Sequence, residues 1–476
     1  MAYKTKDWRN SMRVRVDYNY MMQKSLGDKG LSDKDLHDIK VKAEQAFNYV
    51  KENRGKDELY MGWTELPYNQ DVIVEDIIKT SKEIRKKFKN FVVLGIGGSA
   101  LGPSMVFNAL KHLHYNELKK RGGPRFYVED NVDPVRMQAL LDIIDPKETC
   151  FNVLSKSGAT SETMAQFLII ADALEKAGVS CADNMIFTTD ACRGNLIKID
   201  DLFGGKIKKY ILPDGVGGRF SELCPVGLLP AAVLNIDIKG LLAGAAYMDS
   251  LCQKPQLYKN PALTLASLLY ITMNQGKNIQ VMMPYSDNLK LVSDWYCQLW
   301  AESVGKAYKL DGQLVNAGTT AVKSLGVTDQ HSQVQLYIEG PYDKVISFIS
   351  VDKYACEMPI PVGYDKVPDV GFLGGHTMEE LIKAENKATA YALMRAGRMN
   401  YTIYMPEVNA FTLGQLMYML ELQTAYAGAM LNINTFNQPG VENGKKATFA
   451  LLGKKGYENE KKEMESAPPV EDKYIV

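Results

Sequence analysis

A run of hydroxyl side chains with one lysine occupies residues 155–163, whose sequence is SKSGATSET. The run follows an expected strand at 150–154 and leads into residues 161–177, where apolar side chains recur at helical spacing. A helix N-terminus presents free backbone N–H groups and partial positive charge, and both attract anions. An ordinary N-cap completed by Glu162 needs only one hydroxyl. The additional hydroxyls favour a cradle for a phosphate group.

A glycine-rich loop, GIGGSALGP at 95–103, follows another expected strand at 91–94. Glycine lets the backbone approach a ligand closely, and a helix that starts after the loop would offer N–H groups to an anion. The loop also satisfies the permissive dinucleotide fingerprint, but the acidic residue expected about 20 positions later is missing, since Glu129 and Asp130 come too late. A tight turn with a purely structural role is the third interpretation.

Three further residues can stabilise charge or move protons. Arg219 follows two glycines, and an arginine can stabilise a developing negative charge through several donors. Glu302 lies near the end of a largely apolar helix-like segment, where a carboxylate suits the role of general base. His331 begins another helix-like run, and a histidine can transfer protons near neutral pH. Considered singly, each fits an ordinary role: a surface arginine, a solvated glutamate and a structural histidine.

Residues 436–445, FNQPGVENGK, form a turn after a helix-like run at 411–431. Pro439 fixes φ and Gly440 can adopt positive φ, so the backbone turns sharply here. A turn that holds Gln438 near Lys445 would bind a polar, anionic small molecule. A helix–loop–helix corner with solvated charges is the alternative. The loops at 95–103 and 155–163 and the loop that carries Arg219 count against it, because they also suit an anionic ligand.

The composition is that of a globular protein, with 46% hydrophobic and 24% charged residues. At 476 residues the chain is too long for a single core, so two domains are expected. Lys plus Arg equals Asp plus Glu, 56 each, which argues against a broad nucleic-acid surface. Seven dispersed cysteines indicate neither a zinc site nor a disulfide framework and fit a reducing, cytoplasmic location. The N-terminus has no apolar signal core, and no apolar run of 18 residues suggests a membrane span.

Expected strands alternate with helices, which predicts an α/β fold with parallel sheets covered by helices on both faces. This alternation of strands and helices begins near residue 91 and starts again near residue 279, so two similar α/β units are expected. The predicted organisation is a helical N-terminal arm at 1–70, a first domain at 71–226, a helical connector at 227–275, a second domain at 276–425, and a C-terminal loop, helix and tail at 426–476.

Taken together, these motifs resemble the glucose-6-phosphate isomerase family over roughly residues 60–450. Residues 214–227 (DGVGGRFSELCPVG) and 428–445 (GAMLNINTFNQPGVENGK) are similar to the two family signatures, and GIGGSALGP and SKSGATSET to its sugar-phosphate loops. Glu222 departs from the first signature, which usually has a small or apolar residue there. The resemblance implies two SIS-type (sugar isomerase) αβα sandwich domains with central, mainly parallel sheets plus helical N- and C-terminal arms. It also implies a homodimer and no metal or organic cofactor.

The resemblance also implies residue roles in converting glucose 6-phosphate to fructose 6-phosphate, a glycolytic reaction. Glu302 would move a proton between C1 and C2, and Arg219 would stabilise the enediolate. Lys445 and His331 would serve ring opening, with the histidine supplied by the neighbouring subunit. The residues expected to bind substrate are Ser155, Ser157 and Thr160 at the phosphate, Lys156 nearby, and Gly98, Ser99 and Gln438 lining the site.

Two alternatives remain at this stage. An NAD-dependent dehydrogenase would explain the glycine loop, but the missing ribose-binding carboxylate opposes it. A non-catalytic sugar-phosphate-binding regulator would keep the loop at 155–163 without needing Glu302, Arg219, His331 and Lys445 together. The sequence leaves open whether mannose 6-phosphate is also a substrate and whether the protein has a second role.

Overall fold

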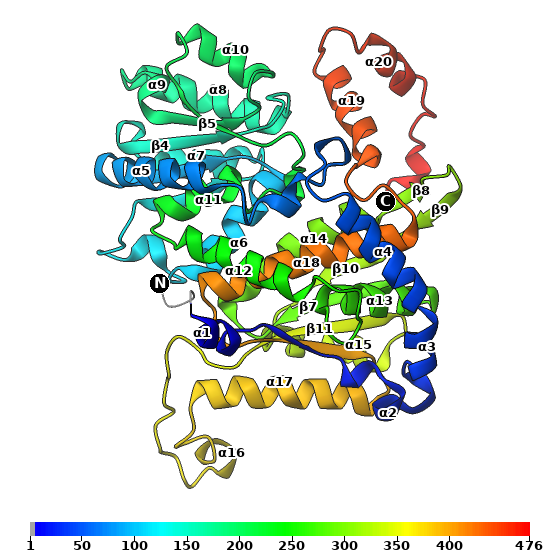
Figure 1. Ribbon diagram of the computed structural model, residues 1–476. Helices are drawn as coiled ribbons and strands as arrows, with labels where there is room; N and C mark the ends of the chain where they lie inside the picture. The colour runs from blue at the N-terminus through cyan, green and yellow to red at the C-terminus, as the bar shows by residue number, and fades with distance from the viewer. Residues whose placement is uncertain (1–4) are drawn as a thin grey trace. The chain divides into compact units, whose positions relative to one another are not determined.

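The computed structural model describes residues 5–476, and the chain divides into two compact units, Met1–Thr435 and Phe436–Val476. Among the described residues, the first unit contains two five-stranded sheets and one two-stranded hairpin, and Figure 1 shows helices around the two larger sheets. The mixed α/β class predicted from the sequence is therefore confirmed. The limits predicted for the individual domains stay a prediction.

The first sheet is wholly parallel and has the strand order β3-β2-β4-β5-β6. Its strands are β2 (Asn90–Leu94), β3 (Arg125–Glu129), β4 (Thr149–Leu154), β5 (Met185–Thr189) and β6 (Lys208–Ile211). The central strands β2, β4 and β5 are buried at every residue, which explains why they appear in the sequence as short apolar runs.

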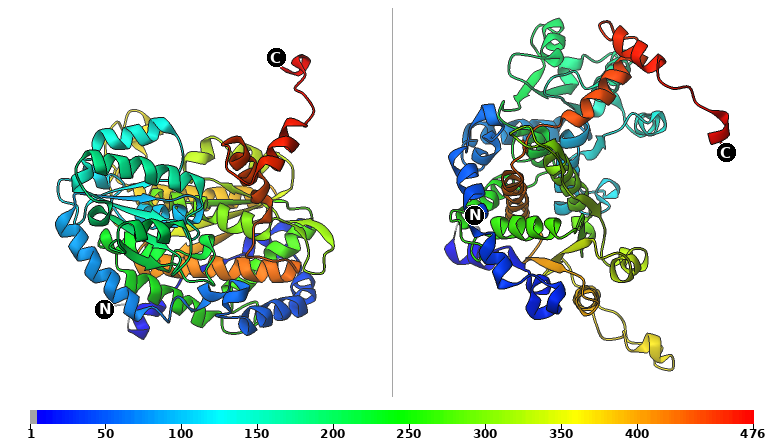
Figure 2. Two further views of the ribbon diagram at one scale, coloured as in Figure 1. Left: turned by 90° about the horizontal axis from the view of Figure 1, so that it is seen from above. Right: turned by 90° about the vertical axis from the view of Figure 1, so that its right-hand side faces the viewer.

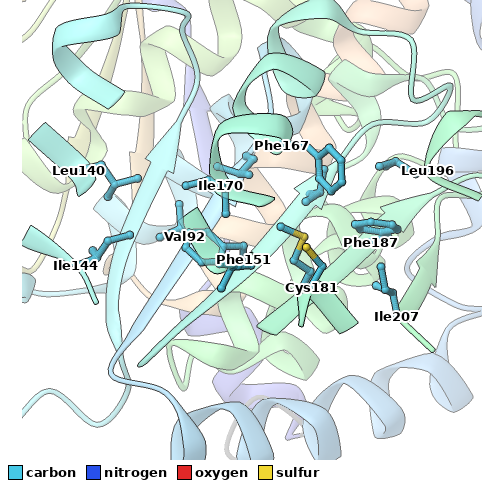
Figure 3. Packing of buried hydrophobic residues seen from close by; sticks show 14 of the residues in the cluster. Val92, Leu140, Ile144, Phe151, Phe167, Ile170, Cys181, Phe187, Leu196 and Ile207 are labelled. Atoms are coloured by element: carbon cyan, nitrogen blue, oxygen red, sulfur yellow. The ribbon is translucent and has the colours of Figure 1, made fainter. Parts of the chain in front are cut away.

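Opposite faces of the first sheet pack against different helices. Phe151 and Val92 face Leu140 of α7 (Pro134–Ile143) and Ile170 of α8 (Ser161–Lys176), as Figure 3 shows. On the other face, Phe126 lies 4.9 Å, centroid to centroid, from Phe107 of α6 (Leu101–Leu110). Both faces of the sheet are thus covered by helices.

The strand order places a topological switch at the carboxyl end of the first sheet. Strand β2 lies between β3 and β4, so the crossovers that follow β2 and β3 carry the chain to opposite sides. Open α/β sheets bind ligands at such a switch point, outside the carboxyl ends of the strands. The glycine-rich loop follows β2 and the hydroxyl-rich loop follows β4, so both predicted ligand loops start at this edge.

The second sheet has the order β1-β12-β11-β7-β10 and is parallel except for β1. Its strands are β1 (Arg15–Asp17), β7 (Ile279–Pro284), β10 (Thr320–Lys323), β11 (Lys344–Val351) and β12 (Asn400–Met405). Strand β1 comes from the N-terminal arm, which was expected to be helical, and pairs antiparallel with β12. A separate antiparallel hairpin consists of β8 (Lys306–Tyr308) and β9 (Leu314–Ala317).

A long buried helix, α18 (Ala410–Leu431), runs through the first unit (Figure 1). It contacts α4 (Lys40–Glu52), α12 (Ile238–Leu251), α13 (Pro261–Asn274) and α14 (Lys290–Val304). A helix that is apolar on all sides needs such complete enclosure. The predicted limit at residue 425 falls inside α18.

The remaining helices of the first unit are mostly short or peripheral. They are α1 (Lys6–Ser11), α2 (Gln23–Leu26), α3 (Asp33–Asp38), α5 (Asp71–Lys87), α9 (Cys181–Asn184), α10 (Asn195–Leu202), α11 (Pro225–Val233), α15 (Val334–Glu339), α16 (Pro368–Gly371) and α17 (Met378–Arg395). Figures 1 and 2 show that the segment carrying α16 extends away from the rest of this unit.

The second unit consists of η12 (Pro439–Val441), α19 (Glu442–Leu451) and α20 (Glu458–Glu465), with the short turn η13 (Asp472–Tyr474) near its end. Helices α19 and α20 contact each other, and Phe449 lies edge-on to Tyr457 at 5.2 Å between centroids. Between residues 5 and 476, no helix has both the length and the apolar character needed to cross a bilayer.

Candidate active site

Two glycine-containing turns approach each other closely at the edge of the first sheet. They are η6 (Gly97–Ser99), after β2, and η9 (Gly218–Phe220), which carries Arg219. A Cβ atom on Gly98 would lie 2.2 Å from the carbonyl carbon of Gly218, so only glycine fits there. The glycine loop therefore has a structural reason for Gly98 in addition to any ligand: it lets the turn that carries Arg219 pack against it.

Arg219 is buried, with 4% of its surface exposed, and is held from several directions. Its Nε donates to Ser303 Oγ at 2.7 Å, Nη1 to Glu302 Oε2 at 3.3 Å, and Nη2 to the carbonyl of Thr435 at 2.6 Å. Burial lowers the pKa of Arg219, and the nearby Glu302 carboxylate opposes this shift. The alternative of a solvated surface arginine is wrong.

Glu302 lies in the last turn of α14 and keeps 34% of its side chain exposed. Its Oε2 accepts from Arg219, and its Oε1 accepts from Gln298 Nε2 at 3.3 Å, one turn earlier on the same helix. The carboxylate is thus held at both oxygens and remains accessible. A fixed, accessible carboxylate beside a guanidinium is the geometry that proton transfer next to a developing anion requires.

The hydroxyl-rich loop gathers its side chains at the start of α8. Ser155 Oγ donates to Thr160 Oγ1 at 3.3 Å, the backbone N–H of Gly158 donates to Ser155 Oγ at 3.1 Å, and that of Ala159 to Ser157 Oγ at 3.1 Å. Thr160 is the N-cap residue of α8, yet its side chain makes no capping hydrogen bond. The hydroxyl at the cap position is therefore not used for capping, which favours the cradle over the ordinary N-cap.

Lys156 connects the two loops. Its Nζ donates to the carbonyls of Pro213, Asp214 and Val216, at 3.0, 2.6 and 3.4 Å. Burial lowers the pKa of Lys156, and Asp214 opposes that shift. The ammonium group therefore anchors the segment that leads to Arg219. A direct role for Lys156 in substrate binding stays a prediction.

His331 is exposed at the end of η11 (Thr328–His331), on the loop after β10. Asp329 fixes this loop by accepting from the Leu325 N–H at 2.7 Å and from Ser332 Oγ at 2.6 Å. Within residues 5–476, no hydrogen bond or ion pair joins His331 to Glu302. The role assigned to His331 stays a prediction.

Gln438 and Lys445 lie in the second unit. Gln438 precedes η12, and Lys445 Nζ donates to Glu442 Oε1 at 2.8 Å on α19. Lys445 is exposed, and its place at the site stays a prediction, as does that of Gln438.

Two residues at the site were not predicted. Gln298 contacts Glu302, and Ser303 contacts Arg219. Gln298 was in reach of sequence reasoning, because residues four apart on a helix are neighbours. Nothing local links Ser303 to Arg219, 84 residues earlier. Among residues 5–476, no group of three or more His, Cys, Asp or Glu side chains is arranged to hold a metal ion.

The chain is similar to known proteins over most of its length. The family model described as phosphoglucose isomerase matches residues 79–467. The glucose-6-phosphate isomerase of Carboxydothermus hydrogenoformans is 49% identical over 456 residues, covering 95% of this chain and 97% of that protein. The enzyme of the same name from Rubrobacter xylanophilus is 41% identical over 448 residues, covering 93% and 99%.

The solved structures extend the similarity to the fold. A hypothetical protein from Thermus thermophilus superposes with a TM-score of 0.82 at 34% identity, covering 93% of this chain and all of that one. A glucose-6-phosphate isomerase from Chlamydia trachomatis has a TM-score of 0.69 at 24% identity, covering 80% and 72%, which shows a shared fold. The resemblance seen in the sequence motifs is therefore confirmed, and the chain belongs to the phosphoglucose isomerase family.

Proposed function

We propose that the protein is a glucose-6-phosphate isomerase, which interconverts glucose 6-phosphate and fructose 6-phosphate by proton transfer through an enediolate. The observation that carries this proposal is the pair of Glu302 and Arg219, an accessible carboxylate 3.3 Å from a buried guanidinium. Aldose–ketose isomerisation needs a base that moves one proton between adjacent carbons and a cation beside the oxygen that becomes negative.

Glu302 takes the proton from C2 of the open-chain aldose, and the electrons of that C–H bond form the C1=C2 double bond. The carbonyl electrons move onto O1, where Arg219 stabilises the negative charge. Transfer of the hydroxyl proton from O2 to O1 and return of the proton from Glu302 to C1 give the ketose. Hydrogen bonds to Ser303, Glu302 and the Thr435 carbonyl are among those that hold Arg219, so little reorganisation is needed during the reaction.

The phosphate end of the substrate fits the loop before α8. Ser155, Ser157 and Thr160 supply hydroxyl donors there, and the helix N-terminus adds positive potential. Gly98, Ser99 and Gln438 line the sugar, and Lys445 and His331 serve ring opening. The chemistry assigns no step to a metal or an organic cofactor.

The active unit is a homodimer in which each site receives His331 from the other chain. Its exposure makes His331 available to a second copy. The segment with α16 supports the same assembly, because it extends away from the rest of the first unit. The two ends of this segment are joined by a hydrogen bond from the Met378 N–H to the Met358 carbonyl at 2.9 Å. This segment exposes large apolar side chains, namely those of Met358, Val362, Tyr364, Val367, Phe372 and Met378. Apolar side chains exposed together on one extended segment favour an interface.

The glycolytic reaction takes place in the cytoplasm, which is where we place the protein. The seven free cysteines are consistent with a reducing compartment.

Turnover of fructose 6-phosphate to glucose 6-phosphate, measured with a chelator present, tests the proposal. Steady formation of glucose 6-phosphate supports it. Binding of fructose 6-phosphate without turnover would instead identify a sugar-phosphate-binding regulator, and a nicotinamide absorption band in the purified protein would indicate a dehydrogenase. Mannose 6-phosphate in a parallel assay defines the substrate range.

A further inference from the structure

Lys306 is a buried lysine four residues after Glu302, at the start of β8, with 7% of its surface exposed. Buried lysines are rare unless their charge is compensated. Here the compensation comes from backbone: Lys306 Nζ donates to the carbonyl of Glu302 and, at 2.9 Å, to that of Ser303. The last carbonyls of a helix lack partners within the helix and carry partial negative charge, so an ammonium group suits this position at the end of α14.

The two residues held by Lys306 are the same two of α14 that contact Arg219. Glu302 accepts from Nη1 of Arg219, and Ser303 accepts from Nε. One ammonium group therefore fixes the backbone from which both side chains reach Arg219. A shift of this backbone would move the carboxylate and the guanidinium contact together.

The charged groups facing Lys306 are Arg219 of η9 and Glu302 of α14. Burial and then the nearby Arg219 lower the pKa of Lys306 to about 8, against an opposing effect from Glu302. Lys306 is thus mostly protonated at neutral pH and loses its charge under mildly alkaline conditions.

We propose that Lys306 is a positioning residue for the isomerisation, which holds the end of α14 so that Glu302 and Arg219 keep their relative geometry. The inference rests on the proposed function. It concerns geometry at the reacting carbons, and the phosphate loop lies on other elements, after β4. Loss of Lys306 should therefore act on kcat and leave phosphate affinity unchanged.

Lys306→Met tests the proposal, with Lys309→Met as the matched control. Lys309 lies three residues further along, and its Nζ donates to Gln313 Oε1 within the same hairpin segment. We expect Lys306→Met to lower kcat about 10- to 100-fold, as for a displacement of about 1 Å at a reacting centre. KM and inhibition by inorganic phosphate should change less than threefold, and Lys309→Met should match the parent. A kcat for Lys306→Met within twofold of the parent would overturn the proposal. Absence of turnover by the parent would instead overturn the proposed function.

Lys306→Arg provides a second test of the positioning role if the methionine variant does not fold. Arginine retains donors for the two carbonyls and stays charged over the whole working range of pH. We expect kcat of the parent to decline as pH rises past about 8, where Lys306 loses its charge. The arginine variant should keep kcat within threefold at neutral pH and lack this decline. An alkaline decline identical to that of the parent would contradict the role of Lys306.

Discussion

The guanidinium of Arg219 and the carboxylate of Glu302 form an ion pair with unequal exposure: Arg219 is buried, and about a third of the Glu302 side chain is open. The arginine is fixed by protein groups on a buried side chain, whereas part of the glutamate side chain is exposed to solvent. A base has to meet the substrate, and an electrostatic stabiliser has to stay in place, so the asymmetry suits the roles proposed for Glu302 and Arg219.

Arg219→Lys should lower kcat/KM about 100-fold. Lysine keeps the charge but presents a single ammonium group, which cannot meet Ser303, Glu302 and the Thr435 carbonyl at the positions of a planar guanidinium. Steady-state kinetics with fructose 6-phosphate measures the effect, and Arg193→Lys, at an exposed arginine, is the control. A loss below threefold would show that the guanidinium geometry is not needed.

Replacing Ser155 and Thr160 together by Ala should weaken substrate binding. The two hydroxyls lie 3.3 Å apart at the start of α8, and a hydrogen bond to a charged group contributes about 1.5–3 kcal/mol. KM should rise and inorganic phosphate should inhibit less well, with a smaller change in kcat. Ser180→Ala, at the N-cap of α9, is the matched control. Unchanged KM together with unchanged phosphate inhibition would reject the cradle.

Glu222, the departure from the family signature, should make stability depend on pH. It is 3% exposed, and neither carboxylate oxygen has a hydrogen-bond partner within the described chain. Burial, and then the neighbouring buried Glu421, raise the pKa of Glu222 well above 4.5. The folded state therefore binds more protons than the unfolded state above pH 4.5, and stability is lost as pH rises towards the raised pKa.

Glu222→Gln keeps the shape of a side chain that packs against Gly102 and Gly227 while removing the titration. Its Tm should exceed that of the parent at pH 8, and the difference should shrink at pH 5. Glu339→Gln, at an exposed position, should show no such change with pH. A Tm difference that is equal at both pH values would mean that Glu222 is ionised in the folded protein.

His331→Ala and Glu302→Gln subunits, each inactive alone, should regain activity when mixed into heterodimers. If His331 serves the partner's site, one site of each heterodimer carries both defects and the other is intact. Activity should then approach half that of the parent per heterodimer. Verified heterodimers without activity would place His331 in the site of its own chain.

The elements with strong local patterns were predictable from the sequence. Strands β2, β4 and β5 are continuous apolar runs, and α8 was placed within one residue of its observed end. Strand β1 and the β8–β9 hairpin were missed because strands of three or four mostly exposed residues carry little apolar signal.

The sequence named candidate residues for the site but did not give their geometry. The types of Glu302 and Arg219 indicated their chemistry, yet only the fold shows that Arg219 is buried and that Ser303 orients it. Nothing in the local sequence indicated a role for Lys306, because that role depends on its burial against the last carbonyls of α14. Contacts between segments far apart in the sequence arise from tertiary packing, which local patterns do not encode.

The most direct test of the account is the turnover of Glu302→Gln. The amide keeps the size of the side chain but cannot accept the proton, so kcat should fall about 10²- to 10⁴-fold. Affinity for a non-reacting sugar phosphate, measured by calorimetry, should stay close to that of the parent, since the phosphate loop is unchanged. A kcat near that of the parent, in a variant confirmed by mass spectrometry, would contradict the assignment of Glu302 as the base.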